Sequence, residues 1–239
     1  MEVVVTRREF AEQIDSRIAR YDLLSHPFYQ AWSLGQLKRQ DLRAYAQDYY
    51  HHVKAFPIYL ARFAARLEEG PVRAAVLANM TDEMGMGPRA GSGGRAHSDL
   101  WQDFAAGMGF SGDLDNHEPT CEVKDLITFF THVACCGTPG EALASFYAYE
   151  SQVPRLAKEK ARGLHALYGA DARTRRYFTL HETADLYHSK VWRTLLETEV
   201  TACPESAPCA LDAAEKAASA LWRTLDGMEN RRGLTARRS

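Results

Sequence analysis

Two histidines and an aspartate are spaced so that one helix could present all three to a metal ion. His181, Asp185 and His188 stand at positions i, i+4 and i+7, which places their side chains within roughly 60° of arc on a helix that turns about 100° per residue. Nitrogen and oxygen donors together suit iron or manganese as well as zinc. The same spacing also fits a solvated or half-buried polar stripe, so the pattern alone leaves both interpretations open.

A buried acid is predicted on a different helix. Glu150 follows the aromatic and small residues 146–149, and an acid in such surroundings needs a cation to balance its charge. The alternative is a glutamate at the surface, or one paired with Arg155 or Lys158. The apolar context favours a role for Glu150 in holding a cation.

Two further donors flank a glycine-rich segment. Glu83 lies near the end of one helical pattern and His97 at the start of the next, on either side of residues 85–94, whose five glycines and one proline exclude a helix. Each alone is more typical of a structural or solvated residue. Helical bundles, however, build carboxylate-bridged dimetal sites from acids and histidines on several helices. His51 or His52 is an alternative donor, although adjacent helical residues point apart and at most one of them can face such a site.

The elements that must position these residues are all helical. Apolar residues recur at intervals of three and four almost throughout, and capping boxes at Thr6–Glu9 and Thr138–Glu141 mark two helix starts. We expect one all-α domain over residues 1–230, a bundle of seven or eight helices, followed by a disordered tail over 231–239. The first helix is expected to begin near Thr6. The helical segments after it are expected at 28–33, 40–67, 71–84, 96–108, 122–135, 139–168, 172–201 and 211–225.

Composition narrows the classes of function. In 239 residues, 31 acids nearly balance 29 lysines and arginines for a net charge of −2, so no strong field would attract nucleic acid. No apolar run approaches the roughly 20 residues that span a bilayer, and no secretory signal is visible, so we expect a cytoplasmic protein without a membrane partner. The five cysteines show no CxxC pair and are predicted to be reduced and mostly buried.

Three segments carry a resemblance to a known family. Residues 23–32 (LLSHPFYQAW), 49–57 (YYHHVKAFP) and 147–154 (YAYESQVP) resemble, in this order, the CADD-like proteins, named after the chlamydial protein associating with death domains. The resemblance implies the seven-helix fold of the heme-oxygenase-like dimetal oxidases, which TenA and PqqC proteins share. It also implies a metal-ligand set of Glu83, His97, Glu150, His181, Asp185 and His188. Among these, His97 departs most from the expected pattern, because the glycine-rich insertion lengthens its distance from Glu83.

The resemblance further implies a reaction in which the protein is its own substrate. CADD-like proteins form 4-aminobenzoate for folate synthesis by oxidising one of their tyrosines, which corresponds here to Tyr29, and a lysine thought to supply the nitrogen corresponds to Lys160. The implied cofactor is a pair of transition-metal ions, iron with iron or iron with manganese. Molecular oxygen is the implied co-substrate, with electrons from an external reductant, and a homodimer is expected. Tyr45, Tyr149 and Tyr177 match tyrosines near the metals that could relay an electron or radical, or could simply pack.

Two conditions accompany this interpretation. Lys160 must be neutral to act as a nucleophile, and burial would lower the pKa of its amine in that direction. The metal ligands also need neighbours that orient them, for which Tyr147 and Tyr187 are our candidates.

Four other functions remain as alternatives. A TenA-like thiaminase needs a cysteine nucleophile shortly before Glu150, whereas residues 144–149 contain none, so Cys135 or Cys136 would have to serve. A PqqC-like oxidase would need no metal and would leave three acids without a balancing cation. A dimetal oxidase of an external small molecule and a scaffold that binds partner proteins are the other two.

Overall fold

The described residues form a bundle built entirely from helices. The computed structural model describes residues 6–88 and 91–236, and within these ranges it contains ten α-helices, three 3₁₀ turns and no strand. The turns are Leu23–Ser25, Leu114–Asn116 and Pro204–Ser206. The α-helices are α1 (Arg7–Ala19), α2 (Pro27–Ser33), α3 (Arg39–Ala64), α4 (Pro71–Glu83), α5 (His97–Gly107), α6 (Cys121–Cys136), α7 (Pro139–Glu150), α8 (Val153–Ala166), α9 (Ala172–Ala202) and α10 (Ala207–Ala236).

The two predicted capping boxes are confirmed. The Thr6 hydroxyl accepts from the backbone N–H of Glu9, while the Glu9 carboxylate accepts from the N–H of Thr6, and Thr138 and Glu141 repeat this exchange at the start of α7. Each box satisfies backbone donors that the first helical turn leaves without a partner. Local sequence therefore determines where α1 and α7 begin.

The described residues contain ten α-helices rather than the predicted seven or eight, and one of the nine expected helical segments is divided in two. The segment 139–168, expected as one helix, divides into α7 and α8, with Ser151 and Gln152 between them and Pro154 in the first turn of α8. Proline lacks a backbone N–H, and inside a helix its ring would clash with the carbonyl four residues earlier, which here belongs to Glu150. The division makes Glu150 the last residue of α7.

The C-terminal prediction is also wrong where the structure tests it. Residues 231–236 continue α10 rather than forming a disordered tail, and residues 237–239 lie outside the described ranges. The guanidinium of Arg231 pairs with the buried carboxylate of Asp48 on α3, and Arg232 pairs with Glu229 one turn earlier. The pair between Arg231 and Asp48 holds the end of α10 against α3, while the pair between Arg232 and Glu229 stabilises the last turns of α10 itself.

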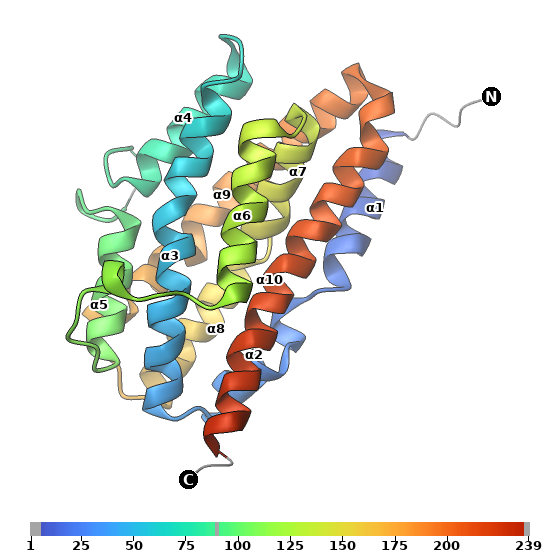
Figure 1. The fold of residues 1–239 in the computed structure, drawn as a ribbon. Coiled ribbons are helices and arrows are strands. Elements are labelled where there is room, and N and C mark those ends of the chain that lie inside the picture. Colours follow the sequence, from blue (N-terminus) through green and yellow to red (C-terminus); the bar gives the residue numbers. More distant parts are fainter. Residues whose placement is uncertain (1–5, 89–90, 237–239) are drawn as a thin grey trace.

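Packing places α9 within the bundle (Figure 1), where it contacts α5, α7 and α8. Helix α3 packs against α4, α5 and α6, and α10 packs against α1, α6 and α7. A continuous core of apolar side chains, many of them aromatic, fills the space between the helices. Four helices that carry predicted donors, α4, α5, α7 and α9, thus belong to one packed unit.

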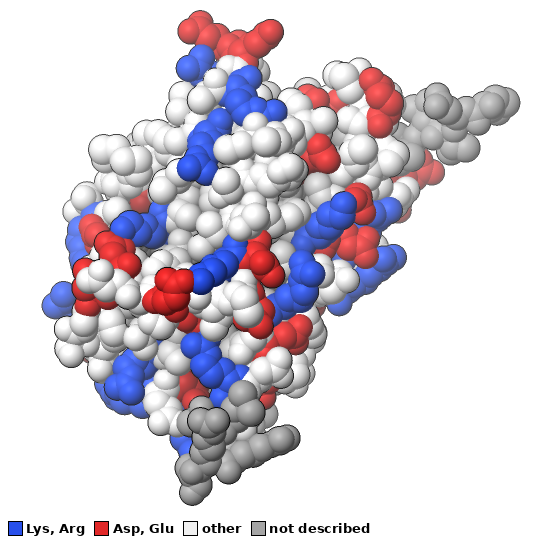
Figure 2. Space-filling model, viewed as in Figure 1, with Lys and Arg blue, Asp and Glu red and all other residues white. Residues whose placement is uncertain are grey.

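The surface agrees with the small net charge. Acidic and basic side chains alternate over the face shown in Figure 2. In the described part of the chain, no helix has the length and apolar character that crossing a bilayer requires. All five cysteines are free, but the expectation that most are buried is wrong, because only Cys203 is even half-buried and the others are exposed. The exposed cysteines are Cys121, Cys135, Cys136 and Cys209.

Candidate metal centre

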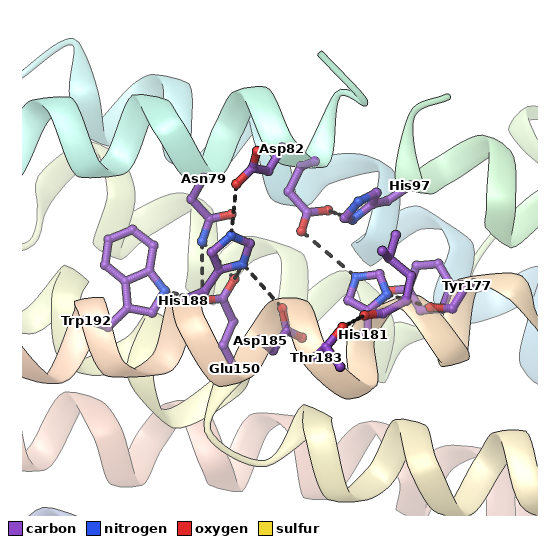
Figure 3. A network of polar contacts seen from close by, with 12 residues as sticks. Asn79, Asp82, His97, Glu150, Tyr177, His181, Thr183, Asp185, His188 and Trp192 are labelled. Carbon is purple, nitrogen blue, oxygen red and sulfur yellow. Dashed lines mark hydrogen bonds and ion pairs between the residues drawn. The ribbon is translucent and has the colours of Figure 1, made fainter. Parts of the chain in front are cut away.

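Helix α9 presents its three predicted donors on one buried face. His181, Asp185 and His188 are each at most 3% exposed, and Figure 3 shows them along the same side of the helix. The Nδ1–H of His181 donates to the backbone carbonyl of Tyr177, one turn earlier, at 2.7 Å. This bond fixes the imidazole ring and leaves its Nε2 facing Glu83, whose Oε1 lies 4.0 Å away.

Glu150 is buried at the end of α7. The amide of Asn79 donates to both of its carboxylate oxygens, at 3.0 and 3.3 Å, and the indole N–H of Trp192 donates to one of them. The alternative of an ion pair with Arg155 is wrong, since that residue pairs with Asp22 instead. Both observed donors are neutral, so the charge of Glu150 needs a positive partner elsewhere.

The glycine-rich segment returns the chain so that its two flanking donors meet. Glu83 ends α4 and His97 begins α5, and the His97 Nδ1 lies 2.9 Å from the Glu83 Oε2. Gly85 has a φ of +76°, and a Cβ atom there would stand 2.2 Å from the backbone oxygen of Arg95. Only glycine tolerates both conditions. Gly85 therefore allows the chain to pass close to Arg95 and to bring His97 beside Glu83, so the insertion is compatible with His97 as a donor.

The structure brings all six predicted donors together in two overlapping clusters. Glu83, His97 and His181 form one cluster, and Glu83 joins Glu150, Asp185 and His188 in the other, with donor atoms in each cluster within 4.8 Å of one another. Three carboxylates and three imidazoles are a donor set that fits iron and manganese. A carboxylate shared between two clusters is the arrangement that a metal-bridging ligand requires.

Electrostatics support this fit. Burial raises the pKa of Glu150. Burial would also raise the pKa of Glu83, but the His97 and His181 rings outweigh it and lower that pKa to about 2. For His188 burial acts to lower the pKa, yet a hydrogen bond with Asp185 and the charge of Glu150 raise it to about 10. Glu83 therefore relies on histidines for positive charge, and His188 faces Asp185 and Glu150, so metal ions could take the place of protons among these groups.

A small second cavity adjoins the donors. It has a volume of about 30 Å³ and is lined by Tyr29, Tyr49 and Lys160 among others. A first, narrower space lies beside Glu83 and Glu150. Tyr149 and Tyr177 line both spaces. Two of the three predicted relay tyrosines, Tyr149 and Tyr177, thus lie between the clustered donors and the predicted reactive pair, whereas the third, Tyr45, contacts that pair directly.

Tyr29, Tyr45 and Lys160 are in contact. The hydroxyls of Tyr29 and Tyr45 lie 3.0 Å apart, the Lys160 Nζ donates to the Tyr45 hydroxyl at 2.7 Å, and it stands 4.4 Å from the centroid of the Tyr29 ring. Lys160 is 8% exposed, and burial holds the pKa of its amine well below the usual range. Burial likewise raises the pKa of both tyrosine hydroxyls. Burial therefore favours the neutral form of all three groups.

The neighbours that orient the ligands are not the predicted ones. Tyr147 donates to Asp15 at 2.7 Å on the far side of α7, and Tyr187 is 44% exposed, with its ring edge-on to His188. Sequence reasoning missed the residues that fill this role. They are Asn79, Asp82 and Trp192. Helical spacing could have found two of them, because Asn79 precedes Glu83 by one turn and Trp192 follows His188 by one turn.

Two other candidates lie outside the clusters. His52 is buried among aromatic rings that include Phe130 and Tyr149, and burial lowers its pKa to about 3, while His51 stacks on His117. Cys135 and Cys136, the candidate nucleophiles of the thiaminase alternative, are exposed at the end of α6, and neither belongs to a cluster of the described residues.

Comparisons with known proteins agree with this geometry. Residues 43–222 match a family model described as iron-containing redox enzyme. The chain is 36% identical to a 4-aminobenzoate synthase of Chlamydia pneumoniae, covering 92% of this chain and 94% of the relative, and 36% identical to one of Nitrosomonas europaea, covering 92% and 90%.

Solved structures agree on the fold. A Shewanella denitrificans domain with a heme oxygenase-like fold has a TM-score of 0.74 at 18% identity, covering 96% of this chain and 92% of that one. A CADD-like protein of Nostoc punctiforme has a TM-score of 0.71 at 16% identity, covering 94% and 95%. The expected heme-oxygenase-like fold is confirmed. The chain belongs to the CADD-like 4-aminobenzoate synthase family of iron-containing redox enzymes.

Proposed function

We propose that this protein is an oxygen-dependent dimetal oxidase that forms 4-aminobenzoate from its own Tyr29, with Lys160 as the nitrogen source. The observation that carries the proposal is the buried amine of Lys160 against the ring of Tyr29, 4.4 Å from Nζ to centroid. The names of the relatives support the product, and the clustered donors support the cofactor.

The atoms of the product fit this assignment. 4-Aminobenzoate is a benzene ring with nitrogen and a carboxyl carbon at opposite positions, and a tyrosine side chain supplies the ring and Cβ at those positions. Nitrogen must then replace the phenolic oxygen, Cβ must be oxidised, and the Cα–Cβ bond must break. Molecular oxygen is the oxidant, and an external reductant supplies the remaining electrons.

The six donors would hold two ions, iron with iron or iron with manganese. His97 and His181 would hold one ion and Glu150, Asp185 and His188 the other, and Glu83, which belongs to both clusters, would be available to either. When bound, the ions supply the redox chemistry with oxygen that protein side chains lack.

The chain's own groups prepare the reacting pair. The Tyr45 hydroxyl accepts a hydrogen bond from Lys160 and pairs with the Tyr29 hydroxyl, so it orients both groups and can pass a proton between them. Tyr149 and Tyr177 line both cavities and are placed to carry an electron from Tyr29 towards the metal ligands. The surrounding aromatic residues bury the amine.

The size of the cavity favours an internal substrate. A volume of about 30 Å³ has room for about two water molecules, whereas the external substrate of an alternative oxidase would need a far larger space beside the ligands.

The first test removes the reacting hydroxyl. Tyr29→Phe is expected to abolish 4-aminobenzoate formation and the accompanying loss of side-chain mass while iron loading persists, because a ring without the hydroxyl cannot be oxidised as a phenol. Intact-protein mass spectrometry and product chromatography after addition of iron, reductant and oxygen measure both effects. Tyr59→Phe is the matched control, a buried tyrosine whose hydroxyl has no hydrogen-bond partner among the residues that the structure describes. Undiminished product from Tyr29→Phe would rule out self-sacrifice.

The second test follows the nitrogen. Protein grown with lysine carrying ¹⁵N only in its side chain is expected to release 4-aminobenzoate labelled in the amino group, because the buried Lys160 amine lies against the ring of Tyr29. Mass spectrometry of the product reports the label, and Lys158, which is exposed on α8, provides a control through Lys158→Met. Unlabelled product from the wild-type protein would exclude lysine as the donor.

The third test concerns the cofactor. Glu150→Ala is expected to lower bound iron, measured by elemental analysis, because it removes a carboxylate from the cluster that also contains Asp185 and His188. Glu205→Ala, at an exposed acid, is expected to leave iron content unchanged. The same stoichiometry in both variants would remove Glu150 from the metal centre.

A further inference from the structure

We infer that Asp82 is a positioning residue for His188, and that the glycine turn after α4 serves to pack against Asp82. The inference rests on the proposed metal centre and goes beyond it, since Asp82 belongs to neither donor cluster. It assigns a role to a carboxylate and a loop that the proposed reaction leaves unexplained.

The two nitrogens of the His188 ring face different partners. Its Nδ1 lies 3.4 Å from Asp185 Oδ1 and 3.8 Å from Glu150 Oε1, within the donor cluster. Its Nε2 lies on the opposite side, 3.2 Å from Asp82 Oδ2. A ring that binds a metal through Nδ1 carries its proton on Nε2, so Nε2–H donates to Asp82 (Figure 3).

Comparison with His181 shows why His188 requires an acceptor from another helix. His181 faces the cluster with Nε2, so its Nδ1–H can bond to a carbonyl of α9 itself, that of Tyr177. His188 faces the cluster with the nitrogen nearer its own backbone, and the remaining N–H points away from α9. Only a group from a neighbouring helix can accept that proton, and Asp82 on α4 does so.

The last turn of α4 is organised around this contact. Asn79 bonds to Glu150, Asp82 bonds to His188, and Glu83 is itself a donor shared by both clusters. Asp82 is 2% exposed, and a carboxylate at that depth needs hydrogen-bond donors. Asn79, Asp82 and Glu83, at the end of α4, therefore contact residues of both donor clusters.

The glycine turn closes over the Asp82 carboxylate. The backbone N–H groups of Met86 and Gly87 both donate to the Thr81 carbonyl at 2.9 Å, which folds the chain back against α4. A Cβ atom at Gly87 would stand 1.9 Å from Asp82 Oδ1. Backbone without a side chain is thus required at Gly87, and we assign this glycine of the insertion to the burial and placement of Asp82.

The test measures metal affinity rather than turnover. In anaerobic titrations of the metal-free protein with Fe²⁺, Asp82→Ala is expected to weaken the ion held with His188 by roughly 10- to 100-fold, the usual effect of losing such a partner. The ion held by His97 and His181 is expected to keep its affinity. Asp82→Asn is expected to recover most of the loss, because the amide oxygen still accepts from Nε2–H.

Two controls separate positioning from general damage. Asp103→Ala removes another buried acid, one that pairs with Arg95 and Arg173, and is expected to leave both affinities unchanged. Gly87→Ala should reproduce the selective loss because it displaces Asp82. Gly94→Ala strains the same segment through its positive φ but places the added Cβ with nothing within 4 Å, so it should not reproduce that loss.

Each outcome decides the inference. Wild-type affinity for both ions in Asp82→Ala would overturn it. Equal weakening of both ions, together with a lower melting temperature of the metal-free variant, would show a merely structural role and would also overturn it. A loss in Asp82→Asn as large as in Asp82→Ala would make Asp82 a direct ligand instead. If the wild-type protein binds no iron, the proposed function fails first and the inference falls with it.

Discussion

The structure depends on one carboxylate shared by two groups of ligands. Glu83 is within reach of His97 and His181 on one side and of Glu150, Asp185 and His188 on the other. Burying this many acids is costly unless positive charge balances them. Two divalent ions bridged by Glu83 would provide that balance, and the other features of the site are consistent with holding them in place.

This constraint explains the irregular parts of the bundle. Pro154 ends α7 at Glu150, which separates that ligand from the helix carrying Lys160. Gly85 lets the chain turn between Glu83 and His97 without a steric clash. Regular α9 supplies three candidate donors from one face, while α4, α5 and α7 each contribute one candidate donor at a helix end. Because the ends of α4, α5 and α7 converge on α9, candidate donors from distant segments of the chain lie close together.

Sequence reasoning succeeded where the signal is local. The spacing of His181, Asp185 and His188 predicts a common face, and the capping boxes predict two helix starts. Family resemblance supplied Tyr29 and Lys160, which the structure places in contact. What failed depends on long-range packing: Asp82 contacts His188 across 106 positions of the chain, and the ion pair between Arg231 and Asp48 extends α10 beyond the predicted boundary. Spacing within a single helix carries no information on either partner.

The most direct test of the shared carboxylate is anomalous diffraction at the iron edge from crystals of protein loaded with iron without oxygen. We predict two peaks roughly 3.5–4 Å apart, as in other two-metal sites, with Glu83 bonded to both. One peak, or two ions that do not share Glu83, would contradict this account of the metal centre.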